Sequence, residues 1–343
     1  MKNFRVALTL VAICALLCCP SGARAQEKAG STTDQVHVVI TDATFRMDTE
    51  LPPLQRDDVK VKQGKNFLDI TQLIPAQGEN DALQLMILID DTLDGTAVGN
   101  NLNDIRDFIS AQPKSALIGV AYMSNAGIQV AQNFTADHDL AAKAIRLPLS
   151  RLSTMDSPYL SLMALVKGWT QQKVRREILM VSDGIDRLRG ESPQLARTSS
   201  SLMGPTTVGP VYHSMPTISQ DANSASEMSQ RYNVIVFPIY SPGVGRAGRS
   251  SWDLQNGLSG LTKIADETGG ECFALSTSAL VSFKPYLDRL QKYLNNQYYL
   301  VFNAPQGKGD RLLRVNIQKV EGKNSEILSP DNVWVSGVPK ASK

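Results

Sequence analysis

The chain has 343 residues, and its 35 Lys and Arg nearly balance its 33 Asp and Glu, for a formal net charge of +2. Because the basic residues form no block, the composition excludes the electrostatic footprint of a nucleic-acid-binding protein. The length allows one large domain with an appendage. No segment after residue 25 is long and apolar enough to span a membrane.

The first 25 residues have the pattern of a secretory signal peptide. Lys2 and Arg5 precede a 14-residue apolar run (6–19), and Ala23-Arg24-Ala25 forms a cleavage signature before Gln26. A membrane-spanning helix needs roughly 20 residues, so an uncleaved anchor is the weaker alternative. We therefore expect a cleaved signal peptide over 1–25 and a secreted or periplasmic protein.

The expected cleavage leaves a single cysteine, Cys272, because the other three lie in the signal segment. One thiol cannot form an internal disulfide, so stability must come from a packed core. We expect Cys272 to belong to that core, in a strand at 271–275, rather than to act as a nucleophile.

Two β regions are expected to flank the main body. Residues 26–80 show strand patterns but no helical period, and residues 301–343 form a C-terminal β extension. We expect the C-terminal strands to pair with the N-terminal ones. The strands are predicted at 36–40, 59–62, 67–73, 298–302, 312–320 and 333–335.

Residues 81–300 alternate between buried strands and amphipathic helices. This alternation predicts a doubly wound, mostly parallel α/β sheet with helices on both faces. The segment 187–220, rich in Ser, Pro, Thr and Gly, is expected to be an irregular insertion. Strands are predicted at 83–89, 116–122, 127–134, 177–181 and 233–240, and helices at 102–109, 140–147, 160–169, 258–267 and 280–294.

Two of the buried strands end in aspartate, at Asp90 and Asp183. Ligands of doubly wound sheets bind beyond the carboxyl ends of the strands. From the end of the first of these strands, oxygen-bearing side chains stand at alternate positions (Asp90, Thr92 and Asp94), and a later loop adds hydroxyl groups. Such all-oxygen ligands suit Mg²⁺ or Ca²⁺ rather than zinc. The predicted metal ligands are Asp90, Thr92, Asp94, Ser157 and Asp183.

This pattern resembles the metal-ion-dependent adhesion site of von Willebrand factor A-type (vWA) domains. Those domains have an apolar strand followed by Asp-x-Ser/Thr-x-Ser, a Ser/Thr in a second loop, and a later strand ending in Asp-Gly. The wider match is to the secreted VWFA-related Acidobacterial domain family, and it includes 38–42, 178–184, 265–270 and 297–300. The resemblance implies a Rossmann-like vWA sheet, a divalent cation and a protein ligand.

On this resemblance, Asp90 and Thr92 match the first two positions of the metal loop. Ser157 matches the second-loop hydroxyl, with Thr154 as the fallback, and Asp183 matches the last loop. The competing interpretation is that these residues are ordinary helix caps and turn residues.

Asp94 departs from the family pattern, which has a second Ser at this position. A third carboxylate makes the site formally −1 with a divalent ion. This charge should strengthen cation capture and weaken the recruitment of an acidic partner.

Residues 243–248 match G-x-G-x-x-G directly after an expected strand, which would favour a phosphate-bearing ligand. In a dinucleotide-binding fold, however, this motif follows the first strand. A flexible Gly-rich loop is therefore the preferred interpretation. No G-x-S-x-G elbow occurs, so a hydrolase of that class has no support.

The sequence thus favours a secreted, non-enzymatic protein-interaction module with a degenerate metal site. A metal-free structural component of an envelope or extracellular assembly is the alternative. An enzyme that uses the Gly-rich loop is the weakest hypothesis.

The signal-peptide hypothesis predicts the N-terminus of the exported protein. Signal peptidase should cleave after Ala25, so mass spectrometry of protein purified from the exported fraction should find a chain that begins at or near Gln26. An intact Met1 on membrane-embedded protein would contradict the hypothesis.

Overall fold

The structure is a computed structural model, and it covers most of the chain after the predicted signal peptide. It describes residues 33–44, 50–170, 174–188, 218–245, 250–320 and 325–338. These described residues form one compact unit. The predicted signal peptide (1–25) and most of the 187–220 segment lie outside the described residues.

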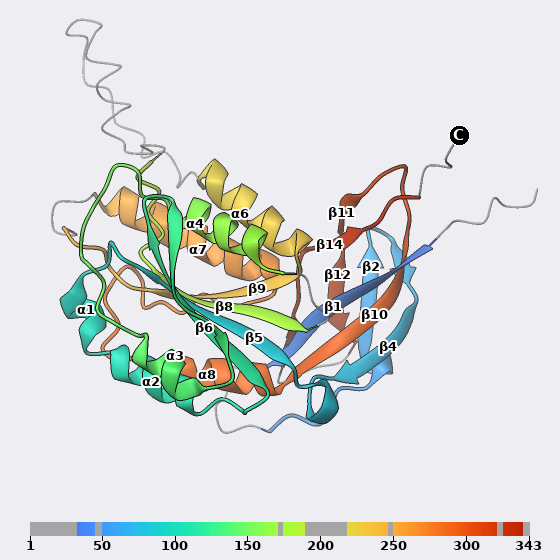
Figure 1. Ribbon diagram of the computed structural model, residues 1–343. Helices are drawn as coiled ribbons and strands as arrows, with labels where there is room; N and C mark the ends of the chain where they lie inside the picture. Colours follow the sequence, from blue (N-terminus) through green and yellow to red (C-terminus); the bar gives the residue numbers. More distant parts are fainter. Residues whose placement is uncertain are drawn as a thin grey trace, which may run out of the picture. The chain divides into compact units, whose positions relative to one another are not determined.

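A five-stranded sheet is the centre of the α/β part (Figure 1), in the order β7-β6-β5-β8-β9. All neighbouring pairs are parallel except β6 and β7, so β7 is an antiparallel edge strand. Every residue of β5 and β8 is buried, as expected for apolar runs covered on both faces. The predicted doubly wound sheet is confirmed. Its strands are β5 (Leu83–Asp90), β6 (Ala116–Ser124), β7 (Gly127–Thr135), β8 (Arg175–Ser182) and β9 (Val234–Tyr240).

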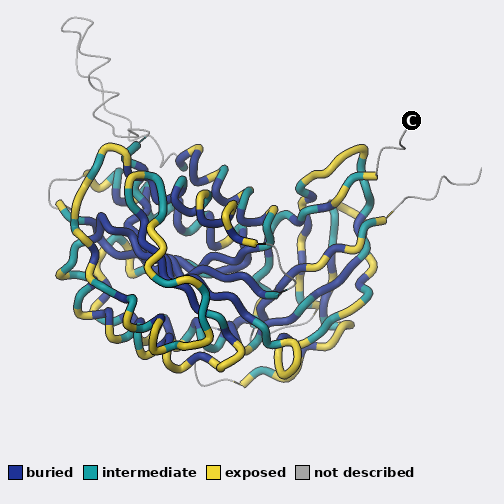
Figure 2. Tube along the Cα trace, in the orientation of Figure 1, coloured by how far each residue is buried: buried dark blue, intermediate teal, exposed yellow. Residues whose placement is uncertain are grey.

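Helices cover both faces of this sheet (Figures 1 and 2), and each face has its own apolar core. In β5, Leu85 and Ile87 face one core, and Met86 and Leu88 face the other. Each such buried side chain stabilises the fold by about 1.5–3 kcal/mol. The first face carries α1 (Gly95–Gly99), α2 (Leu102–Ser110), α3 (His138–Lys143) and α8 (Lys284–Asn295); the second carries α4 (Pro158–Gly168), α6 (Gln220–Arg231) and α7 (Ser251–Thr268).

Helix α6 was not predicted, because it has no apolar stripe. Its inward face consists of small side chains, among them Ala222, Ala225 and Ser229, which are fully buried. Small residues let α6 pack closely against α4 and α7. A helix of this composition leaves no 3.6-residue hydrophobic period in the sequence. No helix in the described ranges is both long and apolar enough to cross a membrane.

Several predicted boundaries were wrong. The helix expected at 140–147 ends at Lys143, and the strand expected at 67–73 is divided into β3 (Asn66–Leu68) and β4 (Ile70–Pro75). The strand expected at 271–275 is only an isolated bridge between Ile239 and Phe273. Cys272 is partly buried there, and burial raises the pKa of its thiol to about 12, so its thiolate form is scarce.

The terminal strands form the flanking β region, as predicted. The largest sheet of this flanking region has the order β13-β1-β10-β4, and β1 pairs with β10 over nearly their whole lengths. Alternate residues of β1 face different cores. Val38 and Ile40 pack inside the β region, and Val39 packs against the α/β body. The remaining strands are β1 (Thr33–Ala43), β2 (Val59–Gln63), β10 (Gln297–Pro305), β11 (Arg311–Arg314), β12 (Asn316–Lys319), β13 (Glu326–Leu328) and β14 (Asn332–Val335), joined as β12-β2-β3 and β11-β14.

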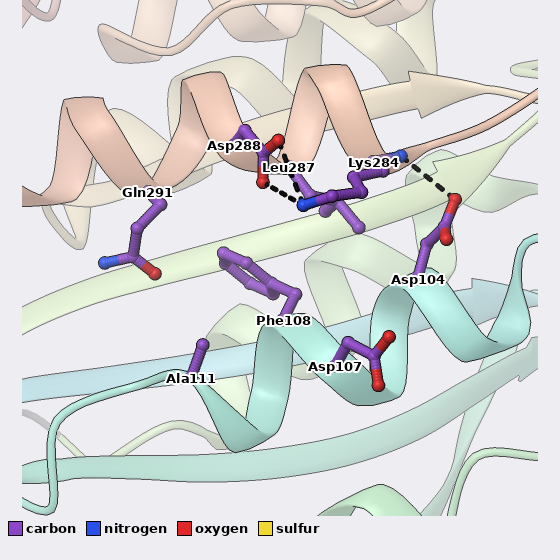
Figure 3. A pocket seen from close by; sticks show the side chains of 8 residues that line it. All are labelled: Asp104, Asp107, Phe108, Ala111, Lys284, Leu287, Asp288 and Gln291. Atoms are coloured by element: carbon purple, nitrogen blue, oxygen red, sulfur yellow. Dashed lines mark hydrogen bonds and ion pairs between the residues drawn. The ribbon is translucent and has the colours of Figure 1, made fainter.

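A carboxylate on α2 fixes the start of α8 (Figure 3). Asp104 Oδ2 accepts hydrogen bonds from Ser282 Oγ at 2.8 Å and from the backbone N–H groups of Phe283 and Lys284 at 2.9 and 3.0 Å. Figure 3 shows the bond from Lys284. The two backbone N–H groups lie at the start of α8, where a helix offers them no intrahelical acceptor. The hollow of about 210 Å³ between the two helices also holds the ion pair of Lys284 with Asp288, at 3.0 Å. We therefore assign the polar groups that line this hollow to the packing of α2 against α8.

The first residues of β8 join the two parts of the fold. Arg175 is 3% exposed and donates to the carbonyl oxygens of Leu294 and Asp81 and to Gln297 Oε1, all at 2.7–2.8 Å. Glu177, on the same face of β8, is fully buried and has no hydrogen bond of ordinary geometry among the described residues. Burial raises the pKa of Glu177 to about 7, and the charge of Arg175 offsets only part of this rise.

The raised pKa of Glu177 predicts a pH-dependent stability. The folded protein holds this proton up to about pH 7, whereas the unfolded chain releases it near the ordinary value of 4.5. The stability of the fold with protonated Glu177 is therefore fully present below about pH 4.5, and it is lost as the pH rises through about 7 and the buried carboxyl ionises. Glu177→Gln should exceed the unmutated protein in free energy of unfolding by up to about 3 kcal/mol at pH 8 and by little at pH 5. Denaturant unfolding at both pH values measures this difference.

Glu79→Gln, at an exposed position, is the control and should show no such pH-dependent gain. An equal difference between Glu177→Gln and the unmutated protein at pH 5 and pH 8 would contradict the assignment.

Candidate functional site

The candidate site lies where β5 and β8 end side by side. Asp90 is 2% exposed and Asp183 is fully buried. Asp90 accepts from the backbone N–H of Thr92 at 2.9 Å and from Ser182 Oγ at 2.8 Å. Asp183 accepts from the backbone N–H of Ile185 at 3.0 Å. Both carboxylates thus close a turn directly after a buried strand, as Asp side chains commonly do.

The two carboxylates affect each other electrostatically. Burial and the negative charge of Asp183 raise the pKa of Asp90 to about 6, and the positive charge of Arg187 lowers it in part. Arg187 Nη2 donates to Asp183 Oδ2 at 2.5 Å, in an ion pair whose arginine side chain is only 10% exposed. Burial alone would lower the pKa of Arg187, but Asp183 and Asp90 outweigh it and raise that pKa. A guanidinium therefore supplies positive charge at this site.

The other predicted ligands have local structural roles. Asp94 is partly exposed and caps α1 by accepting from the backbone N–H of Thr96 at 2.8 Å. Ser157 is buried and caps α4, and it lines a narrow hollow together with Asp90. Thr92 is buried close enough to Asp90 to lower the pKa of that carboxyl, but its hydroxyl makes no hydrogen bond of ordinary geometry among the described residues.

This arrangement does not fit a divalent cation. Within the described ranges, no three His, Cys, Asp or Glu side chains gather closely enough to hold a metal ion. One oxygen of Asp183 is already bound by Arg187, and Asp94 is engaged at the start of α1. Thr154, the fallback hydroxyl, is exposed. The structure therefore brings Asp90 and Asp183 together, with Thr92 and Ser157 beside Asp90, but does not assemble the five predicted ligands around an ion.

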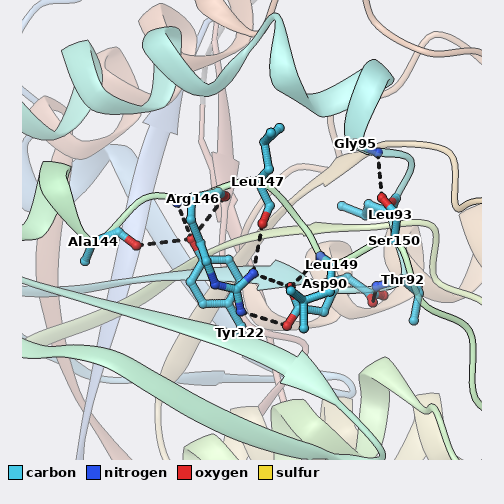
Figure 4. A network of polar contacts seen from close by, with 11 residues as sticks. Asp90, Thr92, Leu93, Gly95, Tyr122, Ala144, Arg146, Leu147, Leu149 and Ser150 are labelled. Carbon is cyan, nitrogen blue, oxygen red and sulfur yellow. Dashed lines mark hydrogen bonds and ion pairs between the residues drawn. The ribbon is translucent and has the colours of Figure 1, made fainter.

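Another carboxylate at this edge, Asp91, organises the loop between α3 and α4, and Figure 4 shows its partner Arg146 over the Tyr122 ring. Arg146 donates to both oxygens of Asp91, at 2.7 and 2.9 Å, and its guanidinium lies 3.6 Å from the centre of the Tyr122 ring. Asp91 Oδ1 also accepts from the backbone N–H of Leu149 at 3.1 Å. Bidentate pairing and stacking of this kind fix an arginine strongly. Sequence reasoning missed Arg146 and Arg187, since neither is adjacent in sequence to its partner.

Close packing explains why the first position of the Gly-rich motif, Gly243, is a glycine. A Cβ on Gly243 would lie 2.2 Å from Asp183 Oδ2 and 3.0 Å from Arg187 Nη2. The neighbouring backbone docks on the metal-loop segment, because the Val244 N–H donates to the Thr92 carbonyl at 2.9 Å. Glycine is thus needed here for the close approach of backbone to an ion pair. The last three residues of the motif, 246–248, lie outside the described residues.

The strand order, the antiparallel edge strand and the two helical layers give the α/β body a Rossmann-like fold of the vWA type. No family model matches the chain, and no curated protein matches it. The narrower resemblance to the VWFA-related Acidobacterial domain family therefore stays a prediction.

Solved structures with similar folds include vWA domains. An aerotolerance-related membrane protein from Bacteroides fragilis aligns over 62% of this chain and 99% of its own, with 13% identity and a TM-score of 0.40. The von Willebrand factor type A structure from Catenulispora acidiphila covers 91% and 76%, with 10% identity and a TM-score of 0.40. The manganese-loaded TRAP protein of Plasmodium vivax covers 79% and 100%, with 9% identity and a TM-score of 0.39. Similarity at this level says nothing about the ligands of this chain.

Gly243→Ala tests whether backbone and ion pair are in close contact. The added methyl group should displace Asp183 or Arg187 and lower the free energy of unfolding by about 1–3 kcal/mol. Gly168→Ala is the matched control, because a Cβ at Gly168 meets no atom within 4 Å. Denaturant unfolding of both variants measures the effect, and equal stabilities would show that the contact is absent.

Proposed function

We propose that this chain is an exported, non-enzymatic protein-interaction module that binds its partner at the carboxyl edge of the vWA-type sheet. The proposal rests on the loop between α3 and α4, residues 144–157, which we call the rim loop. This loop turns polar groups toward the domain and apolar side chains toward solvent.

The inward side of the rim loop is held by polar contacts. Ser150 Oγ donates to the Leu93 carbonyl at 2.9 Å and accepts from the Gly95 N–H at 2.9 Å. Further along the loop, Asp156 is 5% exposed and accepts from the backbone N–H of Asn125, which directly follows β6, at 2.8 Å. These anchors fix the loop against the carboxyl edge, so its outward side chains have a defined position.

The outward side of the rim loop is apolar. Leu147, Leu149, Leu152 and Met155 are 47–53% exposed. Single exposed apolar residues are ordinary, but a group of them marks an interaction surface. Complete burial of a side chain of this size contributes about 1.5–3 kcal/mol, so covering the exposed half contributes on the order of 1 kcal/mol each. The surface suits a protein partner with an apolar patch.

Two features support export and the absence of catalysis. The signal-peptide pattern over 1–25 directs the chain out of the cytoplasm. The titratable groups at the carboxyl edge are held in ion pairs and turns, as Asp91 is by Arg146 and Asp183 by Arg187. We therefore assign these groups to the support of a binding surface rather than to proton transfer.

Substitution of the rim loop tests the proposal. The double variant Leu149→Ser/Met155→Ser should fold with an unchanged thermal midpoint, because both side chains are half exposed. The amount of partner protein that the variant captures by crosslinking in the native exported fraction should fall at least tenfold. The reason is that on the order of 2 kcal/mol of binding free energy from apolar burial is lost. Quantitative mass spectrometry of the crosslinked species measures the loss.

The matched control is Phe67→Ser, which removes a 62% exposed aromatic side chain from the flanking β region. It should leave capture unchanged. If the rim variant and the control retain the same species in the same amounts, the rim loop is not the recognition surface.

A further inference from the structure

The Asp183–Arg187 ion pair is built into the turn that follows β8. Gly184 has φ of +69°, a left-handed conformation that favours glycine, and this turn brings Arg187 back to Asp183. Arg187 Nη2 donates to Asp183 Oδ2 at 2.5 Å, and Nη1 donates to the Ile185 carbonyl at 3.2 Å. The two side chains are 10% and 0% exposed. The pair is therefore shielded from solvent.

The backbone of Arg187 is held as well. Its N–H and that of Leu188 donate to the carbonyl oxygen of Asp156, at 2.9 and 3.0 Å. The Asp156 side chain in turn accepts from the backbone N–H groups of Asn125 and Ser153, at 2.8 and 2.6 Å. The guanidinium is thus positioned by the same loop that precedes α4, where the resemblance places the second-loop ligand.

The charge balance at the end of β8 requires a cation. Two adjacent carboxylates, Asp90 and Asp183, are almost completely buried. Buried like charges are strongly unfavourable unless a positive charge lies beside them. Among the described residues, Arg187 faces both carboxylates, and the backbone at Gly243 packs directly against the Asp183–Arg187 pair. A divalent ion bound to Asp183 Oδ2 would have to displace the guanidinium.

We propose that the guanidinium of Arg187 takes the place of the divalent cation, so that this vWA-type site is assembled and stable without metal. Arg187 is a positioning residue in this arrangement, because it holds the two strand ends together through Asp183. The inference concerns the internal structure of the site and does not depend on the rim loop binding a partner.

The proposal predicts that removal of the guanidinium creates a cation site. Arg187→Gln removes the guanidinium that pairs with Asp183 and faces Asp90. The variant should have a lower thermal midpoint than the unmutated protein in chelator, and Mn²⁺ should restore it by several degrees, because an ion that binds only the folded state stabilises it. Electron paramagnetic resonance should count about one bound Mn²⁺ per variant chain and none on the unmutated protein.

Arg146→Gln is the matched control, because it removes the other arginine paired with a buried carboxylate at this edge. It should lower the midpoint without a response to Mn²⁺. The double variant Asp183→Asn/Arg187→Gln should lose the response of Arg187→Gln. Stoichiometric Mn²⁺ binding by the unmutated protein would overturn the proposal, and so would an Arg187→Gln protein that neither binds Mn²⁺ nor regains stability with it. The unmutated measurement decides the question even if Arg187→Gln folds poorly.

Discussion

The pairing of buried carboxylates with arginines at the carboxyl edge of the sheet is the constraint on which the candidate site depends. Strands β5 and β8 are neighbours; β5 ends in Asp90 and Asp183 directly follows β8, so two negative charges are enclosed at one place. In a low-dielectric interior such charges need a fixed counter-charge. Arg187 provides it from the turn after β8, and the space for the pair depends on Gly243 having no side chain.

A second ion pair at this edge, between Arg146 and Asp91, has a different role in the fold. The Arg146 side chain is 36% exposed, against 10% for Arg187, so it is more accessible to solvent. Asp91 also accepts from the backbone of the rim loop, and this contact sets the position of that loop. One pair therefore stabilises the interior of the site, and the other supports the surface that we assign to partner binding.

The opposite end of the sheet is fixed by Arg175, which contacts the end of α8, the start of β10 and the segment before β5. Through this side chain the α/β body and the flanking β region form a common packed structure. Within the described part of the chain, the carboxylate of Glu177, on the same face of β8, has no hydrogen bond of ordinary geometry. The joint through Arg175 lies at the end of the sheet opposite the candidate site.

The sequence by itself determined the doubly wound sheet, the pairing of terminal strands and the positions of Asp90 and Asp183 at strand ends. The sheet and the two aspartates follow from local information, because buried strands are mostly apolar runs and their ends are marked by polar residues. Helix α6 was missed, since small residues such as Ala222 and Ser229 give no hydrophobic period. Only the tertiary structure decided what surrounds the carboxylates. Whether Arg187 or a metal ion lies beside Asp183, and whether Asp94 faces the site or caps α1, depends on how the turns fold back in space, and residue spacing does not encode that geometry.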